Sequence, residues 1–105
     1  MSPQTFSIEA EQSFLGALMC DGADAMARVE CEVTAAHFYR PDHGRIYAAA
    51  RKLVDAGRSA DAIAVSDALE KDGDLQSVGG LGYVSSLQAS SYSSAGIRRH
   101  AEIIV

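Results

Sequence analysis

The sequence has no tryptophan, and it contains only two cysteines and two prolines among its 105 residues. Cys20 and Cys31 are too few for a disulfide scaffold, so we interpret them as reduced thiols of a cytoplasmic protein. Proline interrupts helices, and its scarcity therefore favours helix over most of the chain. No stretch approaches the roughly 20 consecutive apolar residues of a membrane-spanning helix, and the first residues do not resemble a signal peptide.

Basic residues are also scarce: nine Lys and Arg stand against fourteen Asp and Glu, which gives a net charge of −5. Tight binding to DNA requires clustered cations that neutralise phosphates. Here the cations form only short pairs, at Arg51-Lys52 and Arg98-Arg99. We expect little or no direct DNA binding by this chain. With 48% apolar and 22% charged residues, the composition is typical of one ordinary globular domain.

Apolar residues recur at spacings of three and four, which predicts an all-α fold. The expected helices run from a cap at Ser7 to Asp21-Gly22, over Ala23–Glu32, from Pro41 to Gly57, from Asp61 to Gly73, from Gly79-Gly80 to the serines at 90–94, and from Ala95 to the end. Thr34 is expected to cap a brief turn that presents Phe38 and Tyr39. No alternation typical of strands is present.

The helix from Pro41 has the clearest pattern. Its predicted buried stripe comprises His43, Ile46, Tyr47, Ala50, Leu53, Val54 and Gly57. Because His43 falls on this stripe, we expect a hydrogen-bonded core histidine. The later helices are expected to bury Val65 and Leu69, and then Leu81, Val84 and Leu87. The ring of Tyr83 is expected to pack while its hydroxyl finds a partner.

The last predicted helix ends in three apolar residues, Ile103-Ile104-Val105, without a cap. Helices of free-standing domains seldom end this way, because the final carbonyls and the apolar side chains both need partners. We therefore expect a helix that is truncated here and continues in a longer parent protein. A naturally frayed terminus is the alternative.

The sequence offers no recognisable reactive centre. The glycines at 79, 80 and 82 lack the spacing and the lysine of a phosphate-binding loop. The possible zinc ligands Cys20, Cys31, His37 and His43 are separated by ten, five and five residues, whereas zinc knuckles place two cysteines two to four residues apart. No nucleophile elbow of the Gly-x-Ser-x-Gly kind is present. We therefore predict no catalytic, cofactor-binding or metal-binding residues, and a binding or assembly module instead of an enzyme.

Four segments carry a family resemblance. They are Ser7–Leu18, with its Glu-Ala-Glu-Gln and Leu-Gly elements; Phe38–Tyr47; Gly57 to Leu69-Glu70 followed by Gly79–Tyr83; and Arg98–Val105. With these four segments in this order, the chain resembles the N-terminal domain of bacterial replicative DNA helicases, the DnaB family. The signature residues are Glu11, Gln12, Leu15, Gly16, Phe38, Tyr39, His43, Ile46, Tyr47, Gly79, Gly80 and Tyr83, most of them expected to be packing residues.

The resemblance implies a single orthogonal bundle of about six short helices. It implies a flexible N-terminus over residues 1–6 and a collar domain that interacts with primase over residues 7–105, with the ATPase domain outside this chain. It further implies a non-catalytic assembly domain of a hexameric, ATP-dependent helicase, which mediates subunit pairing and primase docking in DNA replication. ATP and magnesium are then expected only in the separate motor domain.

Two surface sets follow as hypotheses. For self-association we expect the residues of the last helix, Ile97, His100, Ala101, Ile104 and Val105. For partner docking we expect Arg45, Arg51 and Lys52, which alternatively are ordinary solvated surface. Two other functions stay open: a free-standing phage or plasmid adaptor that binds primase or helicase without a motor domain, and a small metal-dependent enzyme.

Overall fold

The computed structural model describes residues 3–29, 32–89 and 104. Within these ranges the chain forms helices and no strand, so the predicted all-α class is confirmed. The elements are α1 (Pro3–Asp21), α2 (Ala23–Ala27), the 3₁₀ turn η1 (Ala35–His37), α3 (Pro41–Asp55), α4 (Ala62–Lys71), the 3₁₀ turn η2 (Gln76–Val78) and α5 (Gly80–Ala89). None of the described helices combines the length and apolar character needed to cross a bilayer.

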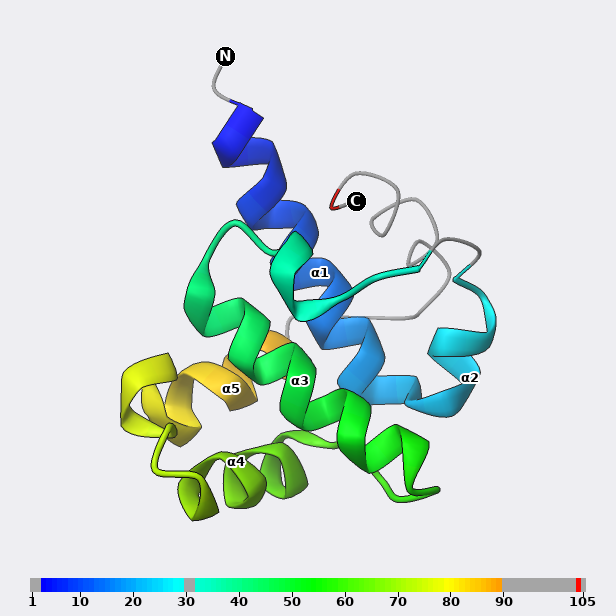
Figure 1. Cartoon of the computed structure of the whole chain (residues 1–105), viewed down its shortest axis with the longest axis vertical. Helices are drawn as coiled ribbons and strands as arrows, with labels where there is room; N and C mark the ends of the chain where they lie inside the picture. Colours follow the sequence, from blue (N-terminus) through cyan, green and yellow to red (C-terminus); the bar gives the residue numbers. More distant parts are fainter. Residues whose placement is uncertain (1–2, 30–31, 90–103, 105) are drawn as a thin grey trace.

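Helix α1 is the central element. It packs against α2, α3 and α5, while α4 packs against both α3 and α5. In Figure 1, α1 descends through the middle of the molecule, α3 crosses beside it, and α4 and α5 lie below and to the left. Helices from the two ends of the described chain, α1 and α5, are therefore neighbours in space.

Apolar side chains from four helices fill the interior. The largest fully buried ones are Phe14, Leu15, Leu18, Ile46, Leu69, Val65, Val78 and Val84. Three aromatic rings meet in this core: Phe38 lies 5.2 Å from Tyr47 and 6.1 Å from Phe14, measured between ring centroids. The buried hydroxyl of Tyr47 donates to the carbonyl of Val33 at 2.7 Å, which satisfies the polar end of the ring.

Several predicted helix boundaries are confirmed. Thr34 is the N-cap of η1. Asp61 caps α4, because its Oδ1 accepts a hydrogen bond from the backbone N–H of Ala64 at 2.9 Å. Gly73 follows α4 with a φ of 76°, a left-handed conformation that favours glycine.

Four boundary or packing predictions are wrong, and one of them is the burial of Gly57, which is exposed after the end of α3. Helix α1 begins at Pro3, because proline is well tolerated in the first turn, so Ser7 lies inside the helix and is not its cap. The second helix ends at Ala27 instead of Glu32. Leu81 is 50% exposed. Steps of three residues drift by about 60° around a helix, so Leu81 and Leu87 lie roughly 120° apart and cannot both face the core.

The last predicted helix lies almost entirely outside the described residues. Ile104 is described, and it is helical and buried in the core with 8% of its surface exposed. Ile104 was expected to serve self-association, but its side chain lies in the core of this domain.

Candidate functional site

Two ionisable side chains, Glu11 and His43, are fully buried in the described interior. Glu11 extends from α1 to the loop that leads into α3. Its Oε2 accepts the backbone N–H of Tyr39 at 2.6 Å, and Oε1 lies 3.5 Å from the backbone N–H of Arg40. Both carboxyl oxygens therefore face backbone N–H groups of this loop. Glu11 thereby fixes the entry of α3 against α1.

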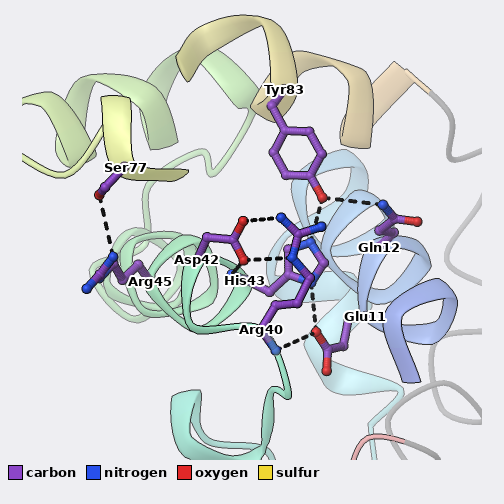
Figure 2. A network of polar contacts seen from close by, with 8 residues as sticks. All are labelled: Glu11, Gln12, Arg40, Asp42, His43, Arg45, Ser77 and Tyr83. Carbon is purple, nitrogen blue, oxygen red and sulfur yellow. Dashed lines mark hydrogen bonds and ion pairs between the residues drawn. The ribbon is translucent and has the colours of Figure 1, made fainter. Parts of the chain in front are cut away.

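His43 connects this carboxylate to α5. Its Nδ1 lies 2.7 Å from Glu11 Oε1, and its Nε2 lies 2.6 Å from the Tyr83 hydroxyl. The amide of Gln12 donates to the same hydroxyl at 3.3 Å. The tautomer of the His43 ring determines which group donates in its contacts with Glu11 and with Tyr83. Figure 2 shows this chain of contacts across α1, α3 and α5.

The ring of Tyr83 contacts two further side chains. It stacks on the His43 ring, with centroids 5.9 Å apart and planes inclined by 4°. The Arg40 guanidinium lies 5.7 Å from the Tyr83 centroid, within cation–π range. Arg40 also forms a two-pronged ion pair with Asp42 (Figure 2). The hydrogen bonds to Asp42 raise the pKa of the Arg40 guanidinium above its ordinary value.

We interpret the Glu11–His43–Tyr83 network as structural. Its order, carboxylate, imidazole and hydroxyl, resembles the relay that activates a nucleophile. A reacting centre also needs room for a substrate beside the nucleophile. Here Glu11 and His43 are sealed from solvent, and the Tyr83 hydroxyl is engaged by two neighbours. The prediction of a hydrogen-bonded core histidine is thus confirmed, as is that of a partnered Tyr83 hydroxyl.

The remaining signature residues mostly serve packing. Leu15, Gly16, Ile46, Phe38 and Tyr47 are buried. Gly79 adopts a φ of 106°, and a Cβ there would come 2.8 Å from the Tyr83 Cβ, so this glycine is required where α5 begins. Tyr39 differs, because 58% of its side chain is exposed and it contributes its backbone N–H instead.

The predicted docking residues all lie on the outer side of α3. Arg45 is exposed and contacts the Ser77 hydroxyl at 3.5 Å. Arg51 is engaged within the chain by Asp55 at 2.9 Å and by the Tyr47 hydroxyl at 3.2 Å. The hydrogen bond to Asp55 raises the pKa of Arg51. Lys52 is exposed. The structure therefore leaves Arg45 and Lys52 available for a partner, whereas Arg51 already has partners.

The other candidates do not form a group within the described residues. Among the self-association residues, Ile104 is buried, and Ile97, His100, Ala101 and Val105 lie outside the described residues. Among the possible zinc ligands, Cys20 donates to the Gln88 carbonyl at 3.6 Å, His37 Nδ1 accepts the Thr34 N–H, and Cys31 is outside the described residues. In the part of the chain that the structure describes, no three His, Cys, Asp or Glu side chains are grouped for a metal ion.

Two important residues were not singled out from the sequence. A Cβ on Gly44 would lie 2.8 Å from the carbonyl oxygen of Ala35, so this glycine allows α3 to approach η1 closely. A glycine inside a helical pattern was the available signal. Gln88 joins three helices, because its Oε1 accepts the Ala62 N–H at 2.8 Å and its Nε2 lies 3.5 Å from the Met19 carbonyl. No sequence signal marked it.

Comparisons with known proteins agree with this architecture. Residues 3–105 match the family described as "DnaB-like helicase N terminal domain". The replicative DNA helicase DnaB of Buchnera aphidicola (from Acyrthosiphon pisum) is 41% identical over 81 residues, which cover 77% of this chain and 17% of that protein. The DnaB protein of Geobacillus stearothermophilus is 33% identical over 98 residues, covering 93% of this chain and 21% of that protein. The chain thus spans about a fifth of the length of these relatives.

A solved structure also matches. The crystal structure of the N-terminal domain of DnaB helicase from Mycobacterium tuberculosis aligns with a TM-score of 0.85 and 34% sequence identity. The alignment covers 92% of this chain and 69% of that one.

Proposed function

Because the chain belongs to the DnaB-like helicase N-terminal domain family, we propose that it is the non-catalytic assembly domain of a hexameric, ATP-dependent replicative DNA helicase. In this proposal it pairs subunits within the ring and docks primase during DNA replication. Unwinding and ATP hydrolysis, with the magnesium they need, belong to a separate motor domain. The chain itself takes no cofactor, binds DNA little or not at all, and acts in the cytoplasm.

The observation that carries the proposal is the use of the family's signature residues in the interior. Glu11, His43 and Tyr83 tie three helices together, and the buried pair has no access to solvent. Residues used in this way maintain a shape and do not turn over a substrate. A helical scaffold contributes to a larger assembly through its outer faces, where apolar patches bury against partners and rim charges set orientation.

The proposal assigns the two interactions to different surfaces. Subunit pairing uses the end of the chain, with Ile97, His100, Ala101 and Val105 as its residues, whereas Ile104 is buried in the core of this domain. Primase docking uses the outer side of α3, where Arg45 and Lys52 are exposed and Arg51 is held by Asp55. Separate surfaces allow a paired domain to hold primase at the same time.

Analytical ultracentrifugation tests the assembly role. This chain alone is expected to be monomeric or weakly dimeric, and extending it by about 40 residues of the parent protein should strengthen self-association, because added helices contribute apolar contact area. Adding purified primase from the same genome should produce a heavier complex. An extended chain that stays monomeric and does not bind primase would contradict the proposal. ATP hydrolysis by the rigorously purified chain would contradict it as well.

A further inference from the structure

Three hollows open along the outer side of α3. The first has a volume of about 300 Å³ and lies between α3 and α4. The second, of about 340 Å³, lies between α3 and residues 32–35, and the third, of about 190 Å³, lies between α3 and the end of α4. Lys52 lines all three, so they adjoin one another at this residue.

The hollow between α3 and α4, here called the α3–α4 groove, has an apolar floor of small residues. Its uncharged lining consists of Ala49, Leu53, Ala56, Ala64 and Ala68. Short side chains on both walls allow a third helix to approach closely, as small residues do at helix contacts. From Arg45 to Ala56 the surface extends about 16 Å along α3, which suits roughly three turns of a docked helix.

The charges beside this floor are only partly compensated within the chain. Arg45 and Lys52 are seven residues apart, two turns along the same side of α3. The carboxylates of α3 are already committed, Asp42 to Arg40 and Asp55 to Arg51. In the described chain Arg45, Lys52 and the neighbouring Arg58 form no ion pair.

The far wall of the surface has the opposite charge. Asp72 and Asp74 line the third hollow together with Arg45 and Lys52. Lys71 and Asp67 of α4 pair with each other at 3.2 Å, so they leave little net charge there. A row of cations on α3 therefore faces carboxylates beyond the end of α4, with an alanine-rich floor between the two helices.

We propose that the α3–α4 groove docks an amphipathic helix of a partner protein. The contact face of that helix carries small apolar residues, acidic residues two turns apart that face Arg45 and Lys52, and a basic residue that faces Asp72. The inference rests on the proposed role as a protein-docking domain and adds the surface and the chemistry of its occupant. A phosphate backbone fits less well, because Asp67, Asp72 and Asp74 border the cations and the chain carries a net charge of −5.

A designed peptide provides the test. It is an 18-residue, alanine-rich amphipathic helix with two glutamates seven residues apart on one face and one lysine beside them. Titrated into the isotopically labelled chain, it should shift backbone amide signals of residues 48–56 and 64–68. A second peptide with lysines in place of both glutamates should bind at least tenfold more weakly.

Charge reversal on the protein makes the test specific. Lys52→Glu should weaken the binding of the acidic peptide at least tenfold. It should strengthen the binding of the lysine peptide by a similar factor. Arg28→Glu is the matched control, because it makes the same charge change at an exposed position after α2 and should leave both affinities unchanged. Thermal melts of both variants report whether each remains folded.

Four results would overturn the inference. They are the absence of any amide shift at millimolar peptide, equal binding by Lys52→Glu and the unaltered chain, tighter binding of a single-stranded oligonucleotide at the same residues, and concentration-dependent shifts there without peptide, which would indicate a second copy. If primase binds the chain and the peptide does not, the inference about the α3–α4 groove fails while the proposed function stands. Primase that fails to bind at all would instead count against the proposed function.

Discussion

At the scale of single residues, the carboxylate of Glu11 determines how two helices meet. It accepts a hydrogen bond from the backbone before α3 and contacts the imidazole of His43, and its side chain is shielded from solvent. Removing a buried hydrogen-bond partner is costly because the groups left behind stay desolvated and unpaired. The stability of the whole domain should therefore depend strongly on this side chain.

Replacing Glu11 by alanine tests that dependence. Glu11→Ala leaves the Tyr39 N–H and His43 Nδ1 without their hydrogen-bond partner, and it should lower the free energy of unfolding by about 2–5 kcal/mol. Glu11→Gln is the control, because its amide oxygen still accepts the Tyr39 N–H, and its loss should be clearly smaller. Urea unfolding followed by circular dichroism measures both. Equal stability of Glu11→Ala and the unaltered chain would show that the network contributes nothing.

Ser66 gives the opposite prediction. Its hydroxyl is buried on α4 and has no hydrogen-bond partner among the described residues. Ser66→Ala removes an unsatisfied polar group and adds helix propensity, so it should raise the free energy of unfolding by about 1 kcal/mol. Ser86→Ala on α5 is the matched control, since that hydroxyl donates to the Tyr83 carbonyl at 2.6 Å. If Ser86→Ala gains as much stability as Ser66→Ala, the Ser66 hydroxyl does not destabilise the fold through its missing hydrogen bond.

At the scale of elements, α3 and α4 were the most predictable. In α3 the apolar spacing, Pro41 at the start and Gly57 after the end all agree. In α4 the side chain of Asp61 and the left-handed Gly73 mark the two ends. Helices with consistent local signals of this kind can be derived from sequence because their limits depend on neighbouring residues.

The ends of α1 and the facing of α5 were less predictable for physical reasons. A serine cap at Ser7 and a proline in the first turn at Pro3 are both acceptable helix starts, and local propensity does not decide between them. In α5, three-residue spacing suggested that Leu81 is buried, although only the neighbours of a short helix decide which side faces the core. Val84 and Leu87 face inward because α1 and α4 pack there.

The cap of α4 can be tested directly. Asp61→Ala removes the acceptor for the Ala64 N–H and should cost about 1 kcal/mol of stability. Asp67→Ala on the same helix is the control, since its ion pair with Lys71 is well exposed and contributes little. Thermal melts of the two variants should therefore differ. A smaller loss of stability for Asp61→Ala than for Asp67→Ala would show that Asp61 does not stabilise α4 as its cap.

At the scale of the whole molecule, the network joins residues that are far apart in sequence. Glu11 and His43 are 32 residues apart, and His43 and Tyr83 are 40 apart. Periodicity places each residue on a helix face, but it does not say which faces meet. The family resemblance marked these residues as a set, whereas their mutual hydrogen bonds follow only from the packing of α1, α3 and α5.

Because the network links α1, α3 and α5, the domain should unfold as one unit. Far-UV circular dichroism reports on all helices, and tyrosine emission reports on rings such as Tyr47 and Tyr83, since the chain has no tryptophan. Both signals should give the same urea midpoint, with a slope of about 1 kcal/mol per molar urea. Two separate midpoints would show that α4 and α5 unfold independently of α1.

The contact between Gln12 and Tyr83 has a consequence for biosynthesis. These residues are 71 positions apart, so α1 leaves the ribosome long before α5 exists. At roughly 5–20 residues per second, that delay amounts to about 4–14 seconds. During this interval the apolar face of α1 that later packs against α5 has no such neighbour, so the emerging chain exposes apolar surface.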